Sequence, residues 1–285
     1  MKNQFLVTAI FLVFYGIHLD AQRVEDNVSY SNKIEQILDE TPAFNRELII
    51  NIKGDSIAAY AFIASGSKLK ETVILIPGYP GNDSNFDVAQ ELRRNGRNVI
   101  HFNHRGAWGS QGIYSYSNCL EDVEHLIHYL SNTKVSAELT VDTNHFCLLG
   151  RSYGGGIALI QGNQIDAVKK IIAISSVNYG NIMKKYKSLE ELSGFRNYMK
   201  KQIMMNHDID QFLEDLFINQ AEYDISKYSN ALGRKNVLII EDSEKNLGWI
   251  NQLSDVESVI MKTDHNFIDK TIELTDLIKS WLDNH

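Results

Sequence analysis

A serine enclosed by glycines is the residue of this sequence best suited to act as a nucleophile. Ser152 lies in the stretch CLLGRSYGGGIALIQG (147–162), with Gly150 two residues before it and Gly154 two residues after it. The apolar run before Gly150 has the pattern of a buried strand, and the run after Ser152 has the pattern of a helix. A tight strand-to-helix turn pushes the hydroxyl out at the end of a sheet, and glycine tolerates the crowding at its flanks. The pattern therefore predicts a nucleophilic serine rather than an ordinary turn residue.

A serine hydroxyl attacks only when a base takes its proton, and one of the nine histidines is well placed for this role. His265 lies in TDHNF, between a strand pattern at 257–261 and a helix pattern at 267–282. In an open sheet of parallel strands, such a loop lies at the carboxyl edge, beside the turn predicted at Ser152. His265 is therefore the predicted general base.

Other histidines are weaker candidates for chemistry. His101 and His104 flank the end of a strand pattern near the same edge, and His145 begins another strand. His125 and His128 lie one helical turn apart, but no acidic or thiol ligands converge on them in the sequence. We therefore predict no metal site, and the serine chemistry requires no organic cofactor.

Strand patterns alternate with amphipathic helix patterns from about Glu47 to the C-terminus. This alternation predicts an α/β domain with a mostly parallel central sheet and helices on both faces. The strand patterns at 47–53 and 57–64 predict an antiparallel edge hairpin around the turn GDS. Further strands are predicted at 72–78, 98–102, 145–149, 170–175, 236–240 and 257–261, and further helices at 84–95, 118–131, from about 153 and at 267–282. Between about 178 and 235 the pattern is only helical, which predicts an inserted helical cap.

Composition and charge exclude some partners. The net charge is −8, and the basic residues are scattered except for the small clusters KLK, RR and KKYK, so a nucleic-acid surface is not expected. The chain has two cysteines, Cys119 and Cys147. Cys147 lies inside a strand pattern and is predicted to be a buried free thiol, but whether the two cysteines are bonded stays open.

The N-terminal residues resemble a secretory leader. Lys2 precedes an apolar stretch from Phe5 to Ile17 that is short for a membrane span, and the small residue Ala21 follows. We predict a signal peptide at 1–21, export to the periplasm or medium, and no membrane span after cleavage. An uncleaved membrane anchor is the alternative. Residues 22–285 suffice for one large α/β domain, and we predict one domain with an insertion.

Five ordered motifs between about residue 47 and the C-terminus resemble the α/β-hydrolase superfamily, most of all its esterases and its prolyl-oligopeptidase-like peptidases. These motifs are ILIPGYPGN (74–82), HFNHRGAWGSQG (101–112), LLGRSYGGG (148–156), NVLII (236–240) and TDHNFID (263–269). The resemblance implies the α/β-hydrolase fold for 22–285 and the order nucleophile, acid, histidine along the chain. It also implies that Arg105 is a structural anchor beside the active site.

The same resemblance implies an oxyanion hole made of two backbone N–H groups. One belongs to the residue after the nucleophile, Tyr153, and the other to the loop after the strand at 72–78. In that loop the second N–H falls on Tyr79, because Pro80 has none. Where such enzymes usually have His-Gly, this chain has Pro77 and Gly78.

The triad acid is where this sequence departs from the superfamily pattern. The usual register after the strand at 236–240 places Lys245 where an aspartate is expected, and lysine cannot accept the histidine N–H. Asp242 lies at the end of the strand, and Glu244 lies one residue before the expected position. We predict Asp242 as the acid, with Glu244 as the alternative. Asp264 adjoins His265, but sequence neighbours tend to point apart.

These features predict an exported, carboxylesterase-like serine hydrolase that acts on a small ester or acyl compound. A peptidase-like serine hydrolase is the nearest alternative, with ester cleavage favoured over peptide cleavage. A pseudoenzyme or binding protein with a lost acid is a further alternative, suggested by Lys245. The Met and aromatic content of the cap fits an apolar acyl or aryl portion of the substrate, and it equally fits packing against the sheet.

Overall fold

The computed structural model describes residues 41–81 and 85–285, so the predicted leader at 1–21 lies outside the described residues. The chain divides into two compact units. The smaller unit comprises Met1–Ala43 and Ser65–Ser67, and within its described part the Gly66 N–H donates to the Thr41 carbonyl at 2.7 Å. The larger unit, Phe44–Ala64 and Lys68–His285, holds the strands and helices that are described below.

The strands of the larger unit form a single eight-stranded sheet among the described residues, in the order β1-β2-β4-β3-β5-β6-β7-β8. The hairpin of β1 and β2 is antiparallel at one edge, β2 also pairs antiparallel with β4, and the other neighbours are parallel. The mostly parallel sheet is therefore as predicted. The strands are β1 (Phe44–Ile52), β2 (Asp55–Ile63), β3 (Lys70–Ile76), β4 (Asn98–Phe102), β5 (Val141–Arg151), β6 (Val168–Ile174), β7 (Asn236–Glu241) and β8 (Glu257–Ile260).

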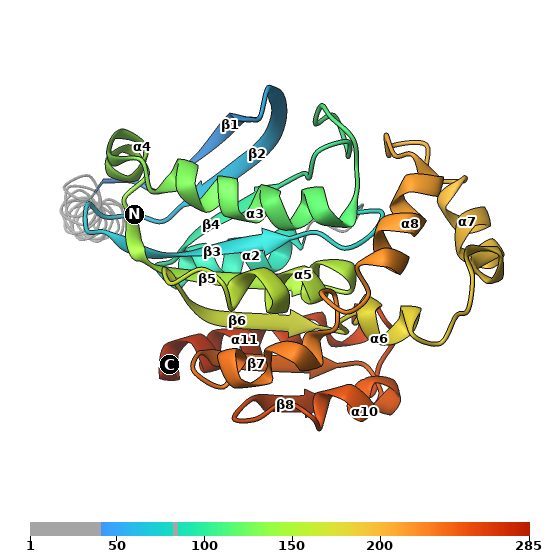
Figure 1. Cartoon of the computed structure of the whole chain (residues 1–285). Helices are drawn as coiled ribbons and strands as arrows, with labels where there is room; N and C mark the ends of the chain where they lie inside the picture. Colours follow the sequence, from blue (N-terminus) through green and yellow to red (C-terminus); the bar gives the residue numbers. More distant parts are fainter. Residues whose placement is uncertain (1–40, 82–84) are drawn as a thin grey trace, which may run out of the picture. The chain divides into compact units, whose positions relative to one another are not determined.

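Helices cover both faces of this sheet, as Figure 1 shows. Along β5, Leu148 packs into the core on the α3 and α5 face, and its neighbour Leu149 packs into the core on the α2 and α11 face. A strand buried on both faces is apolar at successive positions, which explains the continuous apolar runs of the sequence. The four helices are α2 (Phe86–Arg94), α3 (Tyr116–Leu130), α5 (Tyr153–Gly162) and α11 (Thr271–Asn284).

A set of helices is inserted between β6 and β7, as the predicted helical cap requires. In Figure 1, α7 and α8 lie beyond the carboxyl ends of the central strands. Phe212, Leu213 and Leu216 of α8 are buried in the same core as Tyr153. The insertion consists of α6 (Tyr179–Met183), η1 (Leu189–Leu192), α7 (Ser193–Met199), α8 (Ile209–Ile218), η2 (Ile225–Tyr228) and α9 (Ser229–Leu232).

Several local features differ from the sequence prediction. The hairpin turns at Lys53 and Gly54, which both have positive φ, rather than at GDS, because this backbone matches the twist of the paired strands. The last helix begins at Thr271 rather than at 267, because Phe267 has a left-handed backbone with φ 56°. Among the described residues, three short elements had no sequence prediction: α4 (Thr133–Glu138), η3 (Glu244–Asn246) and α10 (Leu247–Ile250). The start of the predicted helix at 267–282 is instead the separate short 3-10 helix η4 (Ile268–Lys270).

Two findings concern the cysteines and the membrane. Cys119 and Cys147 are both free and buried, so the open question of a disulfide is answered and the predicted free thiol at Cys147 is confirmed.

Among the described residues, no helix has both the length and the apolar character that crossing a membrane requires.

Candidate active site

Ser152 occupies a strained turn between β5 and α5. Its φ of 55° and ψ of −116° lie in a region that residues with a side chain rarely adopt. Neighbouring backbone holds it there: the Ser152 N–H donates to the Ile174 carbonyl at 2.7 Å, and its carbonyl accepts from the Val177 N–H at 3.0 Å. The side chain is partly exposed. The turn thus has the geometry that presents a hydroxyl at the edge of a sheet.

The glycines beside Ser152 are required by close backbone contacts. A Cβ atom on Gly150 would lie 2.1 Å from the carbonyl oxygen of Gly154, and one on Gly154 would lie 2.3 Å from the carbonyl oxygen of Ile76. Both distances are far below van der Waals contact. The predicted reason for these glycines, crowding at the turn, is therefore visible in the structure.

Parallel strands bring the candidate residues to one edge of the sheet. Ser152, Ser175, Asp242 and His265 follow β5, β6, β7 and β8, which are consecutive neighbours. Paired residues at the strand ends are in register, since Arg151 lies opposite Ile174 in the sheet. The carboxyl ends of parallel strands lie on the same side, so residues up to 113 positions apart in sequence share one edge.

His265 lies against Asp242. The Nδ1 atom of His265 is 3.0 Å from Oδ2 of Asp242, and the Thr263 N–H donates to the Asp242 carbonyl at 3.2 Å. Asp242 is 5% exposed, whereas the side chain of His265 is 45% exposed. When the Nδ1–H donates to the carboxylate, Nε2 remains as the acceptor that could take a proton from a hydroxyl.

Arg151 connects the serine turn to the histidine loop. Its Nη1 donates to the Asn266 carbonyl at 3.1 Å, and its guanidinium lies 5.9 Å from the centre of the Phe267 ring. The residue before Ser152 therefore contacts the two residues after His265. No role for Arg151 was predicted from the sequence, and its position between a strand end and a predicted nucleophile was the only signal for one.

The carboxylate of Asp242 accepts several further hydrogen bonds. Ser175 Oγ donates to Oδ2 at 2.8 Å, Ser243 Oγ donates to Oδ1 at 2.6 Å, and Lys245 Nζ lies 3.0 Å from Oδ1 and 2.6 Å from Oδ2. Burial alone would raise the pKa of Asp242, but the hydrogen bonds from Lys245, Ser243, His265 and Ser175 hold it well below the ordinary value. Asp242 is therefore an anion at neutral pH.

The other residues considered for the acid lie elsewhere. Glu244 is exposed on η3, and within the described residues it makes no hydrogen bond or ion pair with His265. Lys245, where the superfamily register expects an aspartate, turns back onto Asp242 instead. Asp242 takes the position beside His265 because β7 ends at Glu241, so that Asp242 already lies at the edge of the sheet.

The two predicted oxyanion-hole N–H groups lie at the ends of strands beside Ser152. Tyr153 is the first residue of α5, so its N–H has no acceptor within that helix. Tyr79 follows Gly78, where a Cβ atom would lie only 3.6 Å from Cβ of Ser152. In the described part of the chain, neither N–H has a hydrogen-bond acceptor.

Aromatic rings from the insertion pack around Tyr79. Its ring centre lies 6.4 Å from that of Phe195, 5.9 Å from that of Tyr198 and 6.1 Å from that of Phe212. The ring of Tyr153 lies 6.1 Å away on the sheet side. The insertion therefore contacts the sheet domain beside the serine turn, mainly through aromatic side chains.

Arg105, in the loop after β4, is anchored to two acidic residues of α3. Its Nε donates to Asp122 Oδ1 at 2.5 Å and its Nη2 donates to Glu121 Oε2 at 2.9 Å. The second oxygen of Asp122 accepts from the Arg105 N–H at 2.9 Å and lies 3.2 Å from Nδ1 of His104. The contacts agree with the structural role expected of Arg105, and they show that His104 belongs to the same buried network.

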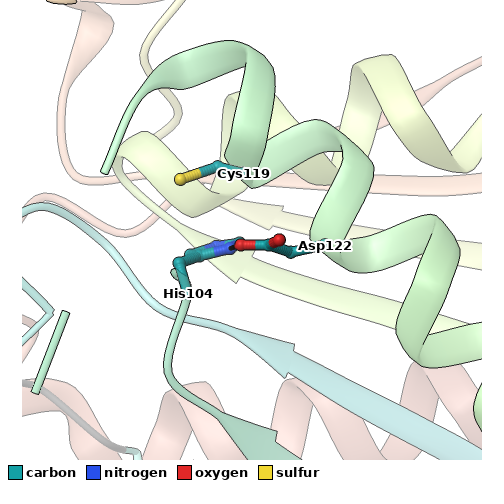
Figure 2. A group of neighbouring side chains, drawn as sticks. All are labelled: His104, Cys119 and Asp122. Carbon is teal, nitrogen blue, oxygen red and sulfur yellow. Dashed lines mark hydrogen bonds and ion pairs between the residues drawn. The ribbon is translucent and has the colours of Figure 1, made fainter. Parts of the chain in front are cut away.

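Figure 2 shows that Cys119 lies next to His104 and Asp122, so these three side chains have the types that could bind a metal ion. Both oxygens of Asp122 are already hydrogen-bonded to Arg105 and His104. Burial raises the pKa of the Cys119 thiol well above its ordinary value, which favours the protonated form that does not bind metals. We interpret this group as a structural link between α3 and the loop after β4.

The other histidines considered as candidates lie among different partners. His101 is buried, and its ring lies 5.2 Å from that of Phe86 on α2. His125 and His128 line a surface hollow beside α4, whose described lining contains no carboxylate. His145 is exposed and lies 2.9 Å from Asp142.

The fold and part of the sequence match known proteins. Residues 71–203 match a family model described as alpha/beta hydrolase fold. No curated protein sequence is significantly similar to the chain.

Solved structures similar to this chain include esterases and a lipase. Est1E from Butyrivibrio proteoclasticus, with ferulic acid bound, is 15% identical with a TM-score of 0.64, and the match covers 83% of this chain and 98% of that one. The alpha/beta hydrolase GrgF from Penicillium sp. sh18 is 13% identical with a TM-score of 0.63, covering 85% and 97%. A soluble variant of the Saccharomyces cerevisiae monoglyceride lipase, in complex with a substrate analog, is 17% identical with a TM-score of 0.61, covering 86% and 96%.

Proposed function

We propose that the chain is a serine hydrolase of the α/β-hydrolase superfamily and that it cleaves an ester or a related acyl bond. In this proposal Ser152 attacks the carbonyl carbon while Nε2 of His265 takes the hydroxyl proton. Asp242 holds the imidazole through Nδ1 and stabilises the imidazolium. The N–H groups of Tyr79 and Tyr153 bind the oxyanion. His265 then protonates the leaving group, and water hydrolyses the acyl-enzyme.

The observation that carries this proposal is the 3.0 Å contact between His265 and an ionised, buried Asp242. A protein that had lost its acid would not need to keep a carboxylate at this distance. The strained backbone of Ser152 supports the same reading, because strain of this kind is retained where the surrounding structure maintains it for a function. These observations favour an enzyme over a binding protein on the same scaffold.

We further propose that the substrate is a small ester rather than a peptide. Two of the similar structures are Est1E with ferulic acid bound and a monoglyceride lipase with a substrate analog bound, which motivates the choice of esters as first substrates. The aromatic rings of the insertion around Tyr79 fit an apolar acyl or aryl portion. Para-nitrophenyl esters of increasing acyl length, compared with amino-acyl anilides, test this choice. Faster cleavage of the anilides would contradict it.

A fluorophosphonate probe tests the nucleophile directly. We expect one adduct, on the peptide that contains GRSYGGG, because only an activated serine attacks phosphorus quickly. The Ser152→Ala variant should remain folded and unlabelled, and His265→Ala should be folded and labelled far more slowly. No adduct on folded wild-type protein would refute the proposed function.

Export remains part of the proposal, because the leader at 1–21 lies outside the described residues. In the exported fraction of a bacterial culture, N-terminal sequencing should find a mature chain that begins near Gln22. Soluble cytoplasmic protein that retains Met1 would refute export without affecting the proposed chemistry.

A further inference from the structure

Lys245, which stands where the superfamily register expects the acid, contacts Asp242, the acid of the proposed mechanism. Its ammonium contacts both oxygens of Asp242, at 3.0 Å and 2.6 Å, and its side chain is 48% exposed. Resting on the proposed function, we propose that Lys245 is a positioning residue that fixes the Asp242 carboxylate and weakens its hydrogen bond to His265.

The number of donors around Asp242 carries this inference. Ser175, Ser243, His265 and Lys245 make five hydrogen bonds to the two carboxylate oxygens, because Lys245 contacts both. A carboxylate offers about four lone-pair sites, two on each oxygen. Oδ2 alone receives Ser175, His265 and Lys245, so Lys245 competes with His265 for the same oxygen.

The surroundings of Lys245 hold it in this position. It belongs to η3, and the next residue, Asn246, donates from Nδ2 to the Ser176 carbonyl at 2.9 Å and to Oε2 of Glu241 at 2.8 Å. Glu241 is 1% exposed, and its Oε1 accepts from the Ser176 N–H at 3.1 Å. The short turn is therefore tied to the ends of β6 and β7, and the lysine reaches Asp242 across only three residues.

Charge gives the direction of the effect. During attack the proposed mechanism places a positive charge on His265, which the Asp242 anion stabilises. The Lys245 ammonium attracts the same oxygen and repels the imidazolium, so it reduces the negative charge available to His265. Removing the ammonium should therefore strengthen the Nδ1–H to Oδ2 hydrogen bond, whereas a residue that only maintained the local structure would weaken this bond when removed.

Proton NMR of the full mature chain, with isotope-labelled histidine, measures this bond through the low-field resonance of the His265 Nδ1–H. In Lys245→Met we expect the resonance to move downfield, and in Lys245→Arg, which keeps the charge, we expect it near the wild-type position. Lys270→Met is the matched control, because Lys270 pairs with Glu273 at the same sequence spacing, 3.2 Å apart, and makes no ion pair or hydrogen bond with Asp242 among the described residues. That control should leave the resonance unmoved.

An unmoved or upfield-shifted resonance in Lys245→Met would overturn the inference. If this variant does not fold, Lys245→Gln removes the charge while keeping a hydrogen-bond donor, and the same downfield movement is expected from it. The resonance is recorded without substrate, so a downfield shift in a protein that hydrolyses nothing would refute the proposed function alone. An active enzyme with an unmoved resonance would refute the inference alone.

Discussion

Replacing Asp242 by asparagine separates the predicted acid from its alternative with a nearly isosteric change. Asparagine keeps the shape of the side chain, removes its charge and puts an NH₂ group in place of one oxygen. Oδ2 faces donors from His265, Ser175 and Lys245, and Oδ1 faces donors from Ser243 and Lys245. The amide NH₂ therefore meets at least two donors in either orientation, and the imidazole loses the partner that sets its tautomer.

The magnitude follows from the role of the carboxylate. Loss of the orienting anion in a Ser-His-Asp triad lowers kcat by ~10⁴, which corresponds to about 5.5 kcal/mol of transition-state stabilisation at about 1.4 kcal/mol per tenfold. KM should change little, because Asp242 is not expected to touch the substrate. Folding should lose about 1.5–3 kcal/mol, the range for hydrogen bonds to a charged group, because Asp242 is buried.

The assay is the hydrolysis of the best para-nitrophenyl ester at saturating concentration, together with urea unfolding of each variant. Glu244→Gln is the matched control, since the glutamate is exposed on η3 and its replacement should alter kcat by less than about twofold. Retention of more than about a tenth of wild-type kcat in Asp242→Asn would refute the assignment of Asp242. A loss in Glu244→Gln alone would transfer the role to that residue.

Two further predictions concern stability. Gly154→Ala should lower the free energy of unfolding by about 1–3 kcal/mol in urea titrations, because its Cβ would lie 2.3 Å from the Ile76 carbonyl oxygen. Gly194→Ala, with open space around the Cβ and a helical backbone, should be neutral or slightly stabilising. Equal effects of the two substitutions would contradict the steric argument. Burial raises the pKa of Glu241 from its ordinary 4.5 to about 7, so the folded state binds an extra proton between these values. Stability should therefore fall by about 3 kcal/mol as the pH rises from 4.5 to 7, which is about 2.5 pH units at 1.36 kcal/mol each, and this dependence should disappear in Glu241→Gln.

The sequence alone determined the features that depend on neighbouring residues. The serine turn follows from a strand, a serine and a helix in immediate succession, and the crowding at Gly150 arises within that same turn, whereas the crowding at Gly154 comes from the end of β3. The strand β4 (Asn98–Phe102) was predicted with its observed bounds, because a short apolar run between turns has few other interpretations. His265 could be predicted at the carboxyl edge because the order of the strands along the chain places its loop there.

The tertiary structure decided the partners of these residues. Asp242, Glu244 and Lys245 lie within four positions of one another, and their spacing does not tell which side chain turns toward His265. That choice depends on where β7 ends and on how η3 turns back. Hydrogen bonds across the sheet edge, such as the one from Ser175 to Asp242 over 67 residues, exist only once β6 and β7 are paired in register. Such a bond leaves no pattern along the chain, because its two residues become neighbours only through the pairing of whole strands.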